Sequence, residues 1–180
     1  DLGGIIWAGA TDGHCELVVS PSISSAAILI ESGVRNVSLS DFKIKCYTVG
    51  AVPVGIQIGN LYYANDSMNI CSDIYVTNVI VERFTDTVVY YQLFSCLFIS
   101  VKSRSATGRG FRAMEGGTSV HWLNCSTYGG TSGFAMDDSL ESVGFIYSSM
   151  TNCVAQNTTV AAYSFRNTSI TLTACGQEFC

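Results

Sequence analysis

Charged residues are scarce in this chain, and basic ones scarcest of all. Only 13% of the 180 residues are charged, and 9 Lys and Arg stand against 14 Asp and Glu, a formal net charge of −5. Binding of duplex nucleic acid requires a basic face, so the sequence predicts no nucleic-acid partner. No run of 18 apolar residues occurs either. This absence argues against insertion in a membrane.

Metal and nucleophile motifs are also missing. There are only 2 histidines, His14 and His121, and neither stands at a zinc-ligand spacing from cysteine. No C-x-x-C pair and no nucleophile elbow occurs. The sequence therefore predicts no metal, no cofactor and no nucleophilic triad.

Helical patterning is absent as well. No segment keeps an apolar stripe of period 3.6 for three turns, and only Pro21 and Pro53 interrupt the chain. What is present is alternation of period two in segments rich in Val, Ile, Thr, Tyr and Phe, which favours pleated backbone. The sequence therefore predicts an all-β protein.

A repeat organises these segments. Taking one inward apolar residue of each unit as a marker gives, in order, Leu39, Val76, Ile99, Trp122, Tyr147 and Leu172. The steps are 99−76=23, 122−99=23, 147−122=25 and 172−147=25, with one long first step, 76−39=37. Such a period predicts a solenoid. We expect a right-handed, single-stranded parallel β-helix of about seven coils, a rod roughly 34 Å tall, as one domain over 1–180. The long step suggests an excursion from Leu61 to Ile70.

A second strand family precedes each marker. The segments 55–60, 110–115, 133–138 and 162–167 align without gaps, and 88–92 fits between them less cleanly. Asparagines at the coil corners suit the left-handed backbone of turns. The 48% hydrophobic content is high for a lone monomer, so we expect a segment of a longer chain, or a flank covered by other copies.

The cysteines fit the repeat as structural residues. Cys125 and Cys175 each lie three residues after a marker, with Met150 expected at the same place between them. Two coils are roughly 9.6 Å, beyond the Cα reach of a disulfide of about 7 Å. We expect them in an internal column with Phe42 and Val79, and Lys102 suggests that the Leu97 coil is shifted by one residue.

The second strand family also yields the candidate site. One register position holds a row of acids and amides that we expect to face outward: Asn60, Gln92, Glu115, Asp138 and Asn167. Glu115 and Asp138 are one coil apart, and adjacent coils could bring their carboxyl groups to the spacing of a glycosidase pair, with Asp137 beside them. Arg109 and Arg112 could bind an acidic sugar or offset these carboxylates. A solvated polar ladder without catalysis is the alternative.

Aromatic residues complete the candidate surface. Trp122 is expected in the core. Five tyrosines fall in loop or outward positions, where their rings could stack on sugars or simply pack: Tyr62, Tyr63, Tyr90, Tyr91 and Tyr128. Of these, Tyr63 and Tyr91 are the candidates for substrate binding.

The coil pattern, the alternating strands 37–40 (VSLS) and 170–173 (ITLT), and the opening segment 4–13 (GIIWAGATDG) followed by 15–19 (CELVV) together resemble the pectate-lyase-like β-helix proteins. They are most similar to the central body of bacteriophage tailspikes and tail fibres. The resemblance implies a homotrimeric rod on the virion tail that binds, and commonly depolymerises, a bacterial surface polysaccharide. The polygalacturonase branch carries Gly-His-Gly after an Asp-Asp pair, and this chain has Asp137-Asp138 without it.

Three functions follow as hypotheses. The first is a tailspike-type protein that hydrolyses a capsular or O-antigen glycan. The second is a receptor-binding or structural shaft without catalysis. The third is a secreted enzyme acting on cell-wall polysaccharide, for which five N-glycosylation sequons, at Asn36, Asn65, Asn124, Asn157 and Asn167, are the sequence feature.

Overall fold

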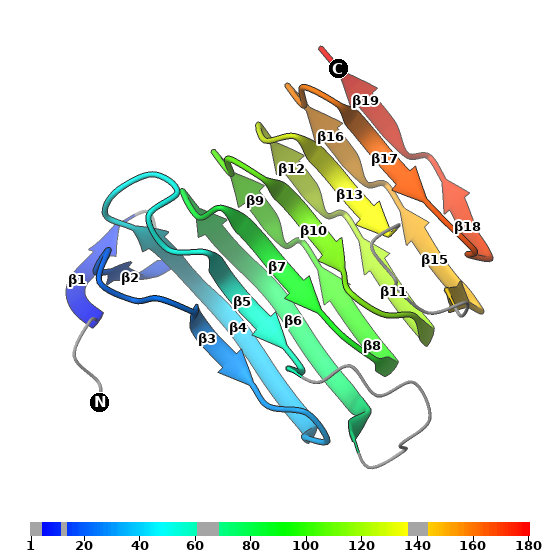
Figure 1. Ribbon diagram of the computed structural model, residues 1–180, viewed down its shortest axis with the longest axis horizontal. Helices are drawn as coiled ribbons and strands as arrows, with labels where there is room; N and C mark the ends of the chain where they lie inside the picture. The colour runs from blue at the N-terminus through cyan, green and yellow to red at the C-terminus, as the bar shows by residue number, and fades with distance from the viewer. Residues whose placement is uncertain (1–4, 12–13, 61–68, 137–143) are drawn as a thin grey trace.

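The fold is built entirely from β-strands. The computed structural model describes residues 5–11, 14–60, 69–136 and 144–180, with side chains from Cys15 onward, and contains no α-helix in those ranges. The strands form two sheets that face each other (Figure 1). The first, of 13 strands, comprises β1 (Ile5–Thr11), β2 (His14–Val19), β4 (Arg35–Cys46), β6 (Cys71–Glu82), β8 (Leu93–Ile99), β9 (Lys102–Arg104), β11 (Gly117–Leu123), β12 (Ser126–Tyr128), β14 (Phe145–Ile146), β15 (Ser148–Thr151), β16 (Val154–Gln156), β18 (Ile170–Thr173) and β19 (Gly176–Glu178). The second, of 6 strands, comprises β3 (Ala26–Ile30), β5 (Val54–Ile58), β7 (Asp86–Tyr90), β10 (Arg109–Ala113), β13 (Ser132–Met136) and β17 (Ala161–Phe165).

Strand pairing is parallel throughout the described residues, apart from the antiparallel pair β1 and β2. In the second sheet the strands lie side by side in chain order. Val88 pairs with Phe111, and Phe111 pairs with Phe134, so the paired positions advance by the same step twice, 111−88=23 and 134−111=23. Tyr163 of β17 continues the row beside Phe134. The predicted all-β class and the register of this strand family are confirmed, including the segment at 88–92.

The first sheet turns a corner at a left-handed residue. The first half of β6 pairs with β8, and its second half pairs with β9. The residue at this corner is left-handed in every unit, with φ between 52° and 60°, at Asp41, Asn78, Ser100, Asn124, Asn152 and Ala174. Asn and Asp tolerate this backbone better than most residues. The Asn78 amide also donates a hydrogen bond of 2.8 Å to the Asp41 carboxylate, so these two corner residues link β6 to β4.

The core lies between the two sheets and is rich in aromatic rings. Trp122 of β11 is buried and stacks on Phe98 of β8, with ring centroids 5.9 Å apart. Tyr90 reaches it from β7 of the second sheet at 6.1 Å. Burial of such large apolar surfaces is the main stabilising term in folding. The predicted core position of Trp122 is confirmed.

Two of the marker residues are wrong. Trp122 pairs with Phe98 and with Met150, so these residues take the places predicted for Ile99 and Tyr147. Tyr147 is 79% exposed. The physical reason at Ile99 is a run of consecutive apolar residues from Leu97, in which alternation alone does not identify the inward residue. Around Tyr147 the spacing of paired positions is longer, since the step from Trp122 to Met150 is 150−122=28.

The cysteine column is also denser than predicted. The pairing of Leu123 with Thr151, and of Thr151 with Thr173, places Cys153 beside both Cys125 and Cys175, where Met150 was expected. Every cysteine from Cys15 onward is a free thiol. Five are buried: Cys46, Cys71, Cys96, Cys125 and Cys153. Burial raises the pKa of the Cys96 thiol to about 11, as expected of a thiol that serves as a small apolar core residue.

Val101 also belongs to the cysteine column. Lys102 pairs with Ile80, so Val101, and not Lys102, lies beside Val79. The predicted one-residue shift around Lys102 is therefore confirmed.

In the part of the chain that the structure describes, no helix combines the length and the apolar character needed to cross a bilayer.

Candidate functional site

The predicted carboxylate site is only partly within the described residues. Glu115 was expected to face outward, but it is buried, with 2% of the residue exposed. The expectation of an outward ladder is therefore wrong at this position. Asp137 and Asp138, the other two predicted catalytic residues, lie outside the described residues.

The amides of the predicted row differ in exposure. Ile58 pairs with Tyr90, and Tyr90 pairs with Ala113, so the row just beyond these strands keeps the predicted register. Asn60 and Asn167 are exposed, whereas Gln92 is partly buried. The backbone NH of Asn60 donates to the Ser32 hydroxyl at 3.0 Å, and Asn167 adopts a left-handed φ of 50°. The row is thus not a uniform outer ladder.

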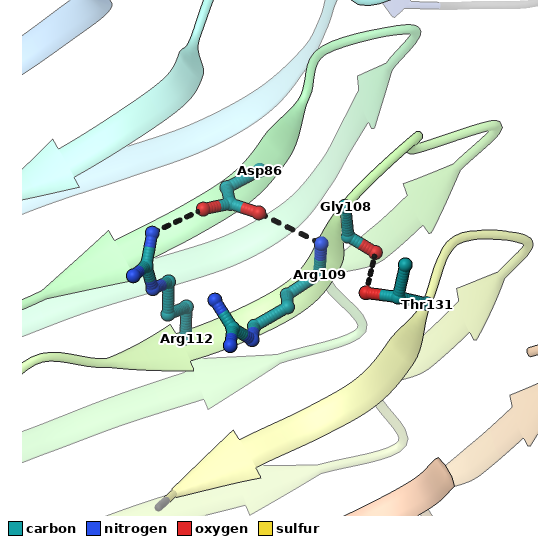
Figure 2. A network of polar contacts seen from close by, with 5 residues as sticks. All are labelled: Asp86, Gly108, Arg109, Arg112 and Thr131. Atoms are coloured by element: carbon teal, nitrogen blue, oxygen red, sulfur yellow. Dashed lines mark hydrogen bonds and ion pairs between the residues drawn. The ribbon is translucent and has the colours of Figure 1, made fainter. Parts of the chain in front are cut away.

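The two predicted arginines meet a carboxylate that sequence reasoning missed. Asp86, at the start of β7, accepts a hydrogen bond of 2.7 Å from the backbone NH of Arg109 and forms an ion pair of 2.8 Å with Arg112 (Figure 2). The Asp86 side chain is 9% exposed and that of Arg112 is 29% exposed. The Arg112 guanidinium is therefore bound to a neighbouring strand of its own sheet.

Tight backbone packing surrounds Asp86. A Cβ atom at Gly108 would lie 2.4 Å from the Asp86 carboxylate, so any larger residue there would have to displace this carboxylate. The Thr131 hydroxyl donates to the Gly108 carbonyl at 3.0 Å, which extends the network to the next strand of the sheet (Figure 2). This dense network favours a structural role for Asp86 and Arg112.

The predicted tyrosines separate into buried and exposed residues. Tyr90 was expected outward or in a loop, but it is fully buried and its hydroxyl donates to the Met136 sulfur at 2.7 Å. Tyr91 is partly buried, and its backbone NH donates to the Ile58 carbonyl at 2.9 Å. Tyr62 and Tyr63 lie outside the described residues. Tyr128 is 49% exposed, as expected of a ring that could stack on a ligand.

Tyr128 belongs to a surface that sequence reasoning did not assemble, which we call the charged face. It lies beyond the left-handed corner of the first sheet, on the outward side of β9, β12, β16 and the second halves of β4 and β6. One register row runs along it through Lys45, Glu82, Arg104, Tyr128 and Gln156. Strands are about 4.8 Å apart, so Lys45 and Tyr128 are separated by about 14 Å.

Ion pairs join the β4 and β6 end of the charged face. Lys43 contacts Glu16 at 3.2 Å and Glu82 at 3.1 Å, and Lys45 contacts Glu82 at 3.5 Å. Burial alone would raise the pKa of Glu82, but hydrogen bonds and charge from the two lysines outweigh it and lower this pKa below 4.5. Burial alone would lower the pKa of Lys43, and the two glutamates outweigh it and raise this pKa above 10.5.

Two hollows open on the charged face. The larger, of about 500 Å³, is lined by Glu82, Lys102, Ser103, Arg104, Ser105, Ser126, Tyr128 and Gln156. The smaller, of about 440 Å³, is lined by Glu16, Val18, Lys45, Tyr47 and Arg83. Tyr47 is 71% exposed, so each hollow carries one open tyrosine ring. Both volumes are within the range of small-molecule binding sites.

The signal for this surface was present in the sequence as two alternating basic pairs. Lys43 and Lys45 flank the buried Ile44, and Lys102 and Arg104 flank the buried Ser103. Alternation of this kind places both cations of a pair on one outer face.

Among the residues described, no group of three or more His, Cys, Asp or Glu side chains is arranged to hold a metal ion.

No protein-family model, no curated protein and no solved structure matches this chain.

Proposed function

We propose that this chain is a right-handed parallel β-helix of the tailspike type, and that its charged face binds a polysaccharide of a bacterial surface. The observation that carries the proposal is the hollow around Tyr128, where a half-exposed ring lies among cations and hydroxyl groups. Sugars are bound through this combination, because apolar ring faces stack on aromatic side chains while hydroxyl groups form hydrogen bonds.

The strand order supports the β-helix. Parallel neighbours require a crossover connection, and here each crossover from one strand of the second sheet to the next passes through strands of the first sheet. The paired positions Phe111 and Phe134 are one such crossover apart. Repetition of this crossover in one hand would coil the chain into the solenoid that the periodicity predicts.

Binding is tested by titrating the protein with a panel of purified capsular and O-antigen polysaccharides. We expect at least one to bind, and Tyr128→Ala to weaken that binding about tenfold or more, since loss of a stacking ring removes a large contact area. Tyr147→Ala is the matched control, because Tyr147 is exposed and lies outside the lining of both hollows. Equal loss of binding in the two variants would contradict the proposed surface.

We further propose that the bound glycan is hydrolysed with Glu115 as a catalytic carboxyl, together with Asp138 and Asp137. The supporting observation is the burial of Glu115, since a carboxyl group is costly to bury and such a group is often retained for function. Release of new reducing ends should fall steeply in Glu115→Gln and Asp138→Asn. Turnover that persists in both variants rules out this pair, and binding without any shortening of the glycan favours a shaft that only attaches to the host.

We also propose that copies of the chain pack together, as a homotrimer on the virion tail. Support comes from the outward side of the first sheet just before its corner, here called the charge-free face. From β4 to β15 it lies between two left-handed residues, such as Asp73 and Asn78 of β6. From β4 to β18, no Asp, Glu, Lys or Arg stands at its outward positions, which are Ser38, Ser40, Tyr75, Thr77, Leu97, Ile99, His121, Leu123, Ser149, Thr151, Thr171 and Thr173.

Each of the six strands contributes four residues up to its corner, so this face measures roughly 29 Å by 13 Å, and contact between two such faces would bury about 750 Å². A stable interface of about 1,200 Å² would have to include the flanking residues as well. Sedimentation of the intact protein tests the assembly. Leu97→Asp with Leu123→Asp should dissociate it, because each introduces an unpaired charge into the contact. A wild-type protein that sediments as a monomer at all concentrations would refute the assembly.

A further inference from the structure

We propose that the larger hollow of the charged face recognises a carboxylate-bearing sugar unit, with Lys102 and Arg104 as the cations that bind it. This inference rests on the proposed polysaccharide function and adds the class of sugar. It concerns a site that is separate from Glu115 and from the Asp86 network.

Lys102 and Arg104 differ from Lys43 and Lys45 of the charged face in having no ion-pair partner among the described residues. Lys43 and Lys45 are both paired with Glu82. Lys102 and Arg104 lie on the same side of β9, and alternate residues of a strand are about 6.6 Å apart. Both line the hollow of about 500 Å³. Two cations that no described acid neutralises thus face one concave surface in a chain whose formal net charge is −5.

Glu82 is the only acid among the described residues that line this hollow, and its charge is already compensated. Its two carboxylate oxygens lie 3.1 Å from the Lys43 ammonium and 3.5 Å from that of Lys45. The hollow is therefore bounded on one side by a neutralised ion-pair network and on the other by two available cations. An anion is the ligand that such a field attracts.

The groups beside these cations favour a sugar over a simple anion. In the parallel pairing of β9 with β12, Tyr128 is the neighbour of Arg104, and Ser126 is the neighbour of Lys102. A pyranose stacked on the half-exposed Tyr128 ring would direct a ring carboxylate to the adjacent guanidinium, which binds carboxylates through two parallel hydrogen bonds. The Ser126 and Ser105 hydroxyls remain within the same lining for sugar hydroxyls.

Nucleic acid is the less favoured anion. A single strand also stacks on aromatic rings, but its affinity depends on a basic groove that follows many phosphates. Beyond Arg104, the same register row continues through Tyr128 to Gln156 and then to the acid Glu178. The Gln156 amide donates to the Glu178 carboxylate, so the row becomes acidic toward β19.

The test uses two matched probes: a hexasaccharide of alternating glucuronic acid and N-acetylglucosamine, and the same oligosaccharide with its carboxyl groups reduced to alcohols. Calorimetry with the intact protein should show the acidic probe binding about tenfold or more tightly than its neutral form, with an affinity that falls as salt rises. Lys102→Gln with Arg104→Gln should remove this difference. Arg166→Gln, which changes net charge by the same sign outside the hollow, should preserve it.

Unchanged circular dichroism and urea midpoints would show that the double variant is folded. Equal binding of the acidic and neutral probes overturns the inference and leaves polysaccharide binding in place, whereas binding of no saccharide in the panel overturns both. Tighter binding of oligothymidylate than of the acidic probe, lost in the same double variant, also overturns the inference.

Discussion

A single added methyl group tests the stacking of neighbouring strands. Gly133 of β13 lies where a Cβ atom would be 2.6 Å from the Ala162 carbonyl oxygen and 2.6 Å from the Ala155 Cβ atom. Ordinary contact begins near 3.4 Å, so Gly133→Ala requires the adjacent backbone to move by 3.4−2.6=0.8 Å. Overpacking of this kind costs about 1–3 kcal/mol, and the lower entropy of the unfolded alanine chain offsets about 0.4–1 kcal/mol of it.

The expected result is a net loss of about 1–2 kcal/mol in the free energy of unfolding, which corresponds to a fall in Tm of about 2–8 °C for a chain of this size. Urea titration followed by tryptophan fluorescence measures it, because Trp122 is buried in the same core. Gly176→Ala is the control, since no heavy atom lies within 4 Å of the added methyl group. Equal midpoints for the two variants would refute the close approach of β13 to its neighbours.

Two further predictions concern thiols and pH. In the native protein an aromatic disulfide reagent should fail to label the five buried thiols, which are those of Cys46, Cys71, Cys96, Cys125 and Cys153. In urea all 8 cysteines should react. Rapid labelling of Cys96 or Cys125 in the native protein would contradict their place in the core column. Because the pKa of Glu82 is lowered below 4.5, its ion pairs stabilise the fold above that pH, and the effect is lost as pH falls through the lowered pKa. Lys43→Gln should therefore lower the free energy of unfolding more at pH 7 than at pH 3. An equal loss at the two pH values would show that ionisation of Glu82 is not coupled to folding through Lys43.

Sequence patterning predicted the second sheet well because its strands alternate cleanly. Phe111 and Phe134 align by hydrophobic spacing alone, and they do pair in the structure. The first sheet was harder where its outward residues are themselves apolar. At β8, Leu97, Phe98 and Ile99 are all hydrophobic, so the pattern fits two registers that differ by one residue, and such a shift exchanges the two faces of the strand.

The candidate site was predicted less well than the fold, for two reasons. Tyr90 stands two residues after the buried Val88, so alternation places it inward despite its hydroxyl group. Glu115 stands two residues after the buried Ala113, just past the end of β10, where a charged residue suggested the opposite side. The charged face was missed because its row combines residues of unrelated chemistry that stand far apart in the sequence, among them Glu82, Arg104 and Tyr128. Only the register of the strands brings such residues together.

The corner of the first sheet separates two surfaces that have different chemistry. Before the left-handed residue Asn124, β11 presents Leu123 on the charge-free face, and after it β12 presents Tyr128 on the charged face. Since a bend of one residue divides the two faces in every unit, the proposed assembly and the proposed sugar binding should respond to different substitutions. A change at Arg104 should leave the sedimenting species unaltered. If a change at Leu123 abolishes both assembly and binding, then the glycan contacts two copies of the chain at once, and Arg104 and Tyr128 form only one side of its site.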